Sequence, residues 1–221
     1  MSDNTDEKNG KNLSRRNFLK GVGIVGAGGG LVTEIFAPET PANAAPLSPA
    51  LATQGETLKK GVQNVTLQVN GKAVTMPVEP RTTLLNALRN HADPPITGPK
   101  LICGVGACGG CTVMLDGKTA YSCLLLAGDV TGKAITTVEG LTAADGSLSH
   151  TQEAFVAHDA MMCGFCTPGF VVSVSALLKT NPHPTLDEVK RACAGNTCRC
   201  GTYPRVFEAA LDAAKKTQGG A

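Results

Sequence analysis

The sequence predicts an α+β protein in two parts, a small mixed sheet crossed by one helix and then a bundle of four helices. Residues 62–140 alternate apolar and polar side chains around two-residue turns, which is typical of strands and hairpins. Residues 148–217 instead carry apolar side chains at helical spacing. Each part also contains its own set of four cysteines. We therefore expect two small domains, with the boundary between Glu139 and Ser149.

The composition indicates a group held by sulfur and gives no sign of a nucleic-acid partner. The chain has 221 residues, of which 42% are hydrophobic, so it can build two small cores. A net charge of +2 is too small to indicate nucleic-acid binding. Nine cysteines together with 26 glycines indicate a backbone that wraps tightly around a group bound by thiols.

Residues 1–44 have the order of regions of a secretory signal peptide. A polar stretch ends in S-R-R-N-F-L-K, a weakly apolar run follows over Gly21–Val32, and P-A-N-A supplies a small-residue cleavage site. The adjacent Arg15 and Arg16 indicate the twin-arginine type. The alternative is a membrane anchor. That needs about 20 apolar residues, whereas this run is shorter, rich in glycine and followed by Glu34.

This signal predicts a periplasmic protein whose mature chain has no membrane span. The twin-arginine route exports proteins that are already folded, often with a cofactor in place, so the cysteines need not form a disulfide framework. Cleavage after Ala44 would leave 15 basic and 13 acidic residues, so the net charge would stay at +2. Residues 45–61, rich in Pro, Ala and Thr, are expected to be a linker.

The two parts divide into short elements with clear starts and turns. The first is expected to contain a hairpin over 65–78 that turns at Asn70-Gly71, a helix through Asn90 capped by Thr82 or Thr83, a hairpin over 111–121 that turns at Asp116-Gly117, and a strand over Ala134–Val138. The second is expected to contain helices over Gln152–His158, Pro168–Lys179, Leu186–Ala192 and Arg205–Lys215. Pro168 suits a first helical turn, and Thr185 with Glu188 forms a capping box.

The first cysteine set has the spacing of a plant-type [2Fe–2S] site. Cys103-x4-Cys108-x2-Cys111 is followed, after eleven residues, by Cys123. The glycines at 104, 106, 109 and 110 permit the backbone to curl around a small inorganic core, including at positive φ. Their amides can also donate hydrogen bonds to sulfur, which offsets its negative charge. Zinc or buried thiols are the alternatives, but zinc sites favour paired C-x2-C halves and this set has only one.

The second set joins a C-x2-C pair, Cys163 and Cys166, to a C-x-C pair, Cys198 and Cys200. Each pair lies at a junction between two predicted helices, so the bundle can bring all four thiols to one spot. Cys166 would lie near a helix N-terminus, where the helix dipole favours a thiolate. On spacing alone, zinc stays an alternative to iron–sulfur for this set.

These motifs resemble the iron–sulfur subunits of molybdenum hydroxylases, the xanthine oxidase family. They are most similar to the small subunits of bacterial periplasmic aldehyde oxidoreductases and of isoquinoline oxidoreductases. The matching segments are C-G-V-G-A-C-G-G-C-T-V at 103–113, the single Cys123, I-T-T-V-E-G-L at 135–141, C-G-F-C-T-P-G at 163–169 and G-N-T-C-R-C-G-T-Y-P-R-V at 195–206. The resemblance spans roughly residues 63–215.

The resemblance implies a β-grasp domain of the plant ferredoxin type followed by an all-α four-helix domain, with one [2Fe–2S] cluster in each. It also implies that the second cysteine set binds iron–sulfur. A separate large subunit would bind the molybdopterin cofactor and hydroxylate an aldehyde or an N-heterocycle. Electrons would pass to the helical-domain cluster, then to the β-grasp cluster, and on to an FAD-binding medium subunit or to the haem of a c-type cytochrome.

Several positions stand outside this pattern. The family often has Gln before the C-G-x-C pair, where this chain has Met162, and a thioether is a poor acceptor and no donor toward a pterin. Ile102 and Thr197, each directly before a cysteine of the motifs, also replace residues common in the family. Cys193, the ninth thiol, is expected to be buried in the core, with a spare cluster ligand as the alternative.

No catalytic residues are expected in this chain. Its four histidines, His91, His150, His158 and His183, do not cluster at metal-binding spacing, so we expect surface or structural roles for them. No Ser-His-Asp set, nucleotide-binding glycine loop or pair of carboxylates is recognisable. The prediction is an electron-transfer subunit of an oxidoreductase. The alternatives are a stand-alone exported ferredoxin-like carrier and a zinc- or disulfide-stabilised binding module.

Overall fold

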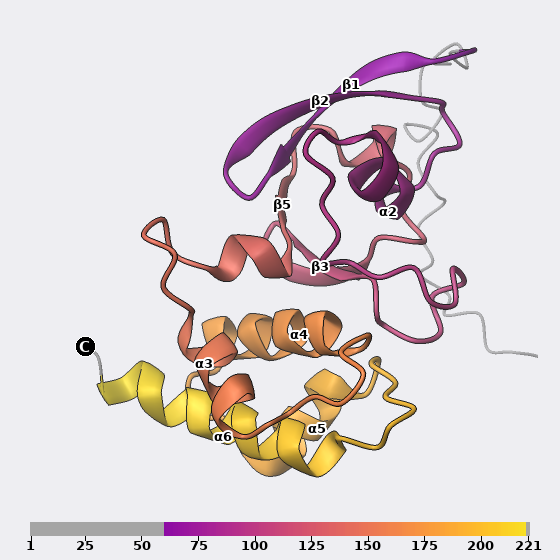
Figure 1. Ribbon diagram of the computed structural model, residues 1–221. Helices are drawn as coiled ribbons and strands as arrows, with labels where there is room; N and C mark the ends of the chain where they lie inside the picture. The colour runs from indigo at the N-terminus through magenta and orange to yellow at the C-terminus, as the bar shows by residue number, and fades with distance from the viewer. Residues whose placement is uncertain (1–59, 220–221) are drawn as a thin grey trace, which may run out of the picture. The chain divides into compact units, whose positions relative to one another are not determined.

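The computed structural model describes residues 60–219, which form a sheet and a group of helices (Figure 1). The signal peptide expected at 1–44, and all but the end of the linker expected at 45–61, lie outside the described residues. Within the described range, no helix is both long enough and apolar enough to cross a membrane.

A five-stranded sheet with the strand order β2-β1-β5-β3-β4 forms the first part. β1 (Gln63–Val69) and β2 (Lys72–Val78) make one antiparallel hairpin, and β3 (Thr112–Leu115) and β4 (Lys118–Tyr121) make the other. β5 (Ala134–Thr136) lies between the hairpins, parallel to β1 and antiparallel to β3. This mixed sheet with its crossing helix confirms the predicted β-grasp arrangement.

Both hairpins turn where the sequence predicts. Asn70 and Gly71 have φ angles of 52° and 76°, and Asp116 and Gly117 have φ angles of 49° and 82°. Two successive left-handed residues match the natural twist of the flanking strands, which is why Asn-Gly and Asp-Gly are favoured there. Alternate side chains of the strands face the core, and Leu67 of β1 is fully buried.

The crossing helix α2 (Leu84–Asn86) continues as a π-helical turn, η2 (Ala87–His91). Of the two candidate threonines, Thr83 caps it, because its hydroxyl accepts a hydrogen bond from the Asn86 amide at 3.2 Å. Leu85 on this helix packs beside two cysteines of the first set. The helix therefore connects the core of the sheet to the proposed cluster site.

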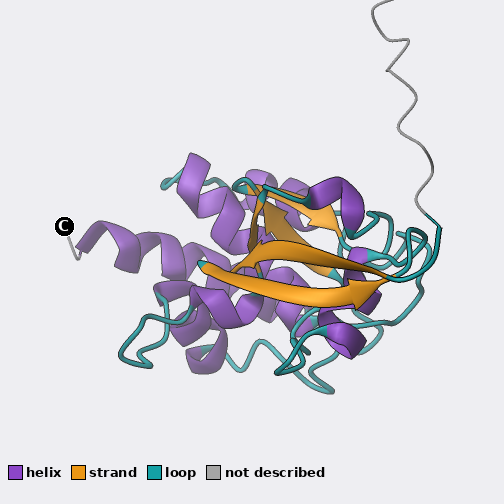
Figure 2. Ribbon diagram, turned by 90° about the horizontal axis from the view of Figure 1, so that it is seen from above, coloured by secondary structure: helices purple, strands orange, loops and turns teal. Residues whose placement is uncertain are grey.

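Four helices form the second part, as predicted (Figure 2). They are α3 (His150–Ala157), α4 (Thr167–Thr180), α5 (Leu186–Cys193) and α6 (Tyr203–Gly219). The predicted capping box of Thr185 and Glu188 starts α5. Phe155 and Phe170 lie at the centre of the helical core and are almost completely buried.

Some element ends differ from the sequence-based expectation. Strand β5 stops at Thr136, because a 3-10 turn, η4 (Val138–Leu141), follows it. Helix α3 starts two residues earlier than expected, because Ser149 and Gln152 form a second capping box, which was not predicted. Helix α6 also extends beyond both expected ends, from Tyr203 to Gly219.

The two parts pack on each other through α4 and β3. Met114 of β3 forms a small buried cluster with Val172 and Ala176 of α4, separate from the main cores of the sheet and of the helices. Figure 1 shows α4 as the helix that runs alongside the sheet. This contact fixes the position of the start of α4, where the second cysteine set begins.

Candidate iron–sulfur centres

All nine cysteines lie within the described residues, and none of them forms a disulfide. In that range, no three His, Cys, Asp or Glu side chains converge as they would around one metal ion. The thiols of the two sets approach each other in pairs, which are Cys103 with Cys108, Cys111 with Cys123, Cys166 with Cys198, and Cys163 with Cys200. Two pairs per set suit a two-iron core, because four thiolates are shared between two irons.

The first set lies on the loop before β3 and on the turn after β4. Gly104, Gly106 and Gly109 have φ angles of 67°, 72° and 68°, a region that residues with a side chain rarely adopt. Gly110, which was expected to share this role, does not adopt a positive φ. The Val105 amide donates a hydrogen bond to Cys103 Sγ at 3.5 Å. The loop thus has the predicted curl at three of the four glycines, but its amide donor to Cys103 is Val105 rather than one of the glycines that were predicted.

The first set has an outer and an inner pair. Cys103 and Cys108 are half-buried, whereas Cys111 and Cys123 are buried. The hydrogen bond from the Val105 amide lowers the pKa of Cys103 to about 6, and burial raises the pKa of Cys111 to about 11. Cys103 therefore ionises readily, whereas Cys111 requires a bound cation to hold it as thiolate.

The second set lies at the two junctions between consecutive helices. Cys166 is the N-cap residue of α4 and so lies near a helix N-terminus, as predicted, but burial raises its pKa to about 12. Burial also acts to raise the pKa of Cys198, but hydrogen bonds, first that of Thr202, lower it to about 7. Cys163 and Cys200 are exposed and form the outer pair of this set.

A buried hydroxyl beside the second set has no hydrogen-bond partner in the part of the chain that the structure describes. Thr167 follows Cys166 directly, and its Oγ1 makes no hydrogen bond to the described residues. Leaving a buried hydroxyl unpaired costs about 1–3 kcal/mol. A sulfide or thiolate of an iron–sulfur group could accept a hydrogen bond from it. The unpaired hydroxyl of Thr167 and the paired thiols of the second set therefore have the chemistry that binding an iron–sulfur cluster requires.

The remaining thiol and two of the histidines have ordinary structural surroundings. Cys193 is only 2% exposed, as predicted for a core thiol, and burial raises its pKa to about 12. His150 lies 3.7 Å from a carboxylate oxygen of Glu153, and His158 lies 3.4 Å from one of Asp212. These contacts agree with the surface or structural roles expected for these two histidines.

The loops of the two sets are hydrogen-bonded to each other. The amide of Thr197, the residue before a cysteine of the second set, donates to the carbonyl of Cys108 in the first at 2.9 Å. The side chain of Asn196 donates to the Gly109 carbonyl at 2.9 Å and accepts from the Ser173 hydroxyl at 2.8 Å. This connection was not predicted from the sequence, in which its one available signal was the asparagine inside the G-N-T-C-R-C motif.

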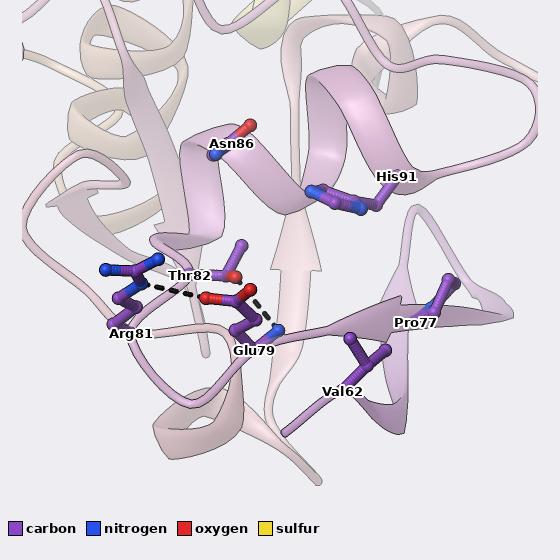
Figure 3. Close-up of a pocket in the computed structure, with 7 residues that line it drawn as sticks. All are labelled: Val62, Pro77, Glu79, Arg81, Thr82, Asn86 and His91. Atoms are coloured by element: carbon purple, nitrogen blue, oxygen red, sulfur yellow. Dashed lines mark hydrogen bonds and ion pairs between the residues drawn. The ribbon is translucent and has the colours of Figure 1, made fainter. Parts of the chain in front are cut away.

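An open hollow of about 520 Å³ lies between β2 and the crossing helix (Figure 3). No cysteine lines it, and its two oppositely charged side chains, Arg81 and Glu79, pair with each other at 2.8 Å. Both side chains of this pair are exposed, so the pair is screened by water. The hollow is therefore not part of either cysteine set.

Comparison with known proteins identifies both parts. Residues 67–142 match the family profile of a 2Fe-2S iron-sulfur cluster binding domain, and residues 137–211 match that of a [2Fe-2S] binding domain. The chain is 49% identical over 149 residues to the nicotine 6-hydroxylase small subunit of Paenarthrobacter nicotinovorans. The aligned residues cover 67% of this chain and 88% of that subunit. The chain belongs to the iron–sulfur subunits of molybdenum hydroxylases.

Solved and curated relatives agree with this membership. The aldehyde oxidoreductase iron-sulfur-binding subunit of Escherichia coli K12 is 39% identical over 168 residues, covering 69% of this chain and 72% of that one. Quinoline 2-oxidoreductase from Pseudomonas putida 86 matches with a TM-score of 0.67 and 38% identity, over 72% of this chain and 98% of that chain. Aldehyde oxidoreductase from Desulfovibrio gigas matches with a TM-score of 0.66 and 36% identity, over 72% of this chain and 18% of that chain. This iron–sulfur subunit therefore has two [2Fe–2S]-binding domains.

Proposed function

We propose that this iron–sulfur subunit relays electrons one at a time from the molybdopterin site of a large partner subunit to a flavin or cytochrome acceptor. The proposed ligands are Cys103, Cys108, Cys111 and Cys123 for the β-grasp cluster, and Cys163, Cys166, Cys198 and Cys200 for the helical-domain cluster. The observation that carries the proposal is the hydrogen bond from the Thr197 amide to the Cys108 carbonyl, which joins the two ligand sets through their own loops.

The number of centres suits the chemistry of the partner. Oxidation of an aldehyde or an N-heterocycle releases two electrons, whereas a [2Fe–2S] cluster takes up one. Two one-electron centres in series can therefore accept both electrons and pass them on in turn. The chain's own residues hold the two thiol sets at a fixed separation, because Asn196 and Thr197 connect the loops on which the sets lie.

Exposed apolar side chains lie next to the outer thiols of the second set. Met162 and Phe165, which flank the exposed Cys163, are 69% and 56% exposed. Side chains of this kind at the surface mark sites of protein contact. We place the molybdopterin-binding subunit on this surface, so that electrons enter through the helical-domain cluster.

A second exposed apolar group lies around the first set. Val105 is 70% exposed and Leu124 is 61% exposed, and Leu101 beside them is also exposed. Gly106 leaves room for this arrangement, because a Cβ there would lie 2.4 Å from Leu124 Cδ1. We assign this surface to the electron acceptor, an FAD-binding medium subunit or a c-type cytochrome.

The relatives support a proposal for the substrate class, and the N-terminal sequence supports a proposal for the location. The similar proteins are subunits of enzymes named for nicotine, quinoline and aldehydes, which supports an aldehyde or an N-heterocycle as substrate. The adjacent Arg15 and Arg16 support export of the folded subunit to the periplasm by the twin-arginine route. A partner without a signal of its own would be exported together with it.

Purification from the native host tests the relay against a stand-alone carrier. The tagged chain should co-purify with a molybdopterin-binding subunit, and the complex should oxidise substrate while the isolated chain oxidises none. Mixing substrate with the complex should reduce both clusters within turnover. Substrate oxidation by the isolated chain, or its purification alone with both clusters intact, would contradict the proposal and favour the alternative carrier.

A further inference from the structure

A second hydroxyl lies against the inner pair of the second set. Thr202 Oγ1 is 3.1 Å from Cys198 Sγ, and both residues are buried. In a free thiol, either atom could be the donor. A metal-bound thiolate has no proton, so in the loaded protein the hydroxyl of Thr202 must donate to the sulfur.

The position of Thr202 makes this contact notable. It directly precedes α6, where a threonine hydroxyl normally accepts a hydrogen bond from an amide of the first turn. Among the described residues, the one hydrogen bond of its hydroxyl is with the sulfur of Cys198, while its carbonyl accepts from the Val206 amide at 3.1 Å. The hydroxyl of Thr202 therefore hydrogen-bonds to a cysteine of the second set instead of capping α6.

The neighbouring residue holds the same cysteine from its backbone side. The Cys198 amide donates to the hydroxyl of Tyr203 at 2.8 Å, and the ring of Tyr203 meets Phe170 edge to face with centroids 5.8 Å apart. The two consecutive residues before and at the start of α6 therefore fix both the amide and the sulfur of Cys198. A donor that is buried and held in this way keeps its geometry when the charge on the sulfur changes.

We propose that Thr202 sets the reduction potential of the helical-domain cluster by donating a hydrogen bond to the Cys198 thiolate. This inference rests on the proposed ligation by Cys198. When the cluster gains one electron, negative charge on its sulfur atoms increases, and a hydrogen-bond donor to sulfur stabilises that reduced form. The hydroxyl keeps its proton, so the step is a pure electron transfer. Thr202 thereby favours electron uptake at the entry point of the relay.

A redox titration of the purified complex, followed by electron paramagnetic resonance, tests this role. Thr202→Val removes the hydroxyl at nearly constant volume. It should make one-electron reduction of the helical-domain cluster about tenfold less favourable, a downward shift of about 59 mV, and leave the β-grasp cluster unchanged. Thr202→Ser should stay near the wild type because it keeps the hydroxyl.

Thr180→Val is the matched control. The Thr180 hydroxyl bonds to the Leu177 carbonyl at 3.0 Å, at the end of α4 about 20 Å from its start. Its loss should shift neither potential. If Thr202→Val loses the cluster, Thr202→Ala and Thr202→Ser are compared in the same titration, and alanine should lower the potential relative to serine.

The outcomes separate this inference from the ligand assignment. Equal potentials in the wild type and Thr202→Val, or in the alanine and serine variants, would overturn the role of Thr202 and leave the ligands in place. If Cys198→Ser changes neither cluster signal, the ligation by Cys198 itself is wrong, and the inference fails with it.

Discussion

Alanine in place of Gly169 should destabilise the subunit, although Gly169 lies in helix α4. Helix propensity alone predicts the opposite sign, because alanine is favoured over glycine by about 1 kcal/mol within a helix. A Cβ at this position, however, would lie 2.3 Å from the Gly109 carbonyl oxygen and 2.8 Å from Asn196 Nδ2. The first of these atoms belongs to the backbone of the first cluster loop, which cannot rotate away as a side chain could.

The size of the effect follows from these two opposing contributions. Overpacking costs about 1–3 kcal/mol, and a clash with backbone belongs at the upper end of that range. Subtracting the gain in helix propensity leaves a net loss of about 2 kcal/mol in the free energy of unfolding. For a protein of this length, 1 kcal/mol shifts the unfolding midpoint by about 2–4 °C, so the midpoint should fall by about 4–8 °C.

The assay follows the visible absorbance of the clusters through a thermal scan. Wild type and variants are compared at one scan rate, because loss of the clusters is irreversible. Gly128→Ala is the control, since a Cβ there meets no atom within 4 Å, and its midpoint should stay near that of the wild type. A midpoint for Gly169→Ala at or above the wild-type value would refute the close packing of α4 against the first cluster loop.

Three further predictions concern residues outside this contact. Cys193 should resist iodoacetamide at pH 8 in the native subunit, because burial raises its pKa to about 12, and mass spectrometry should find it alkylated only after unfolding; native labelling would contradict its burial. Replacing Arg15 and Arg16 by lysine should hold the precursor in the cytoplasm with its clusters in place, and normal periplasmic delivery on cell fractionation would count against the twin-arginine route. Met162→Gln should change the rate at which substrate reduces the clusters of the assembled complex in rapid mixing, and an unchanged rate would reduce Met162 to a packing role.

Local chemistry explains why much of the fold could be predicted from the sequence. The Asn70-Gly71 turn is specified by two adjacent residues that tolerate a left-handed backbone, and the start of α5 by a capping box of two residues. The first cysteine set was recognisable because its ligand spacing reflects how the chain wraps around a small core, whereas the iron–sulfur assignment of the second set depended on the family resemblance. Each of these sequence patterns lies within a few residues of the turn, helix start or ligand loop that it predicts.

The features that the sequence did not reveal depend on distant parts of the chain. Asn196 contacts Gly109 across 87 positions of sequence, and no local pattern predicts such a pairing. The pKa of Cys166 was expected to follow the helix dipole, but burial by the surrounding core raises it instead. Both the contact and the raised pKa depend on tertiary packing, so neither can be predicted from local sequence.

The two-cluster relay is tested most directly by chemical analysis and electron paramagnetic resonance of the purified protein. About four iron and four acid-labile sulfide atoms per chain are expected, with two distinct signals in the reduced state. Cys200→Ser should remove or alter one signal and spare the other, whereas Cys193→Ser should leave both. A single signal from the wild type, or the loss of a signal in Cys193→Ser, would contradict the assignment of two clusters to the two cysteine sets.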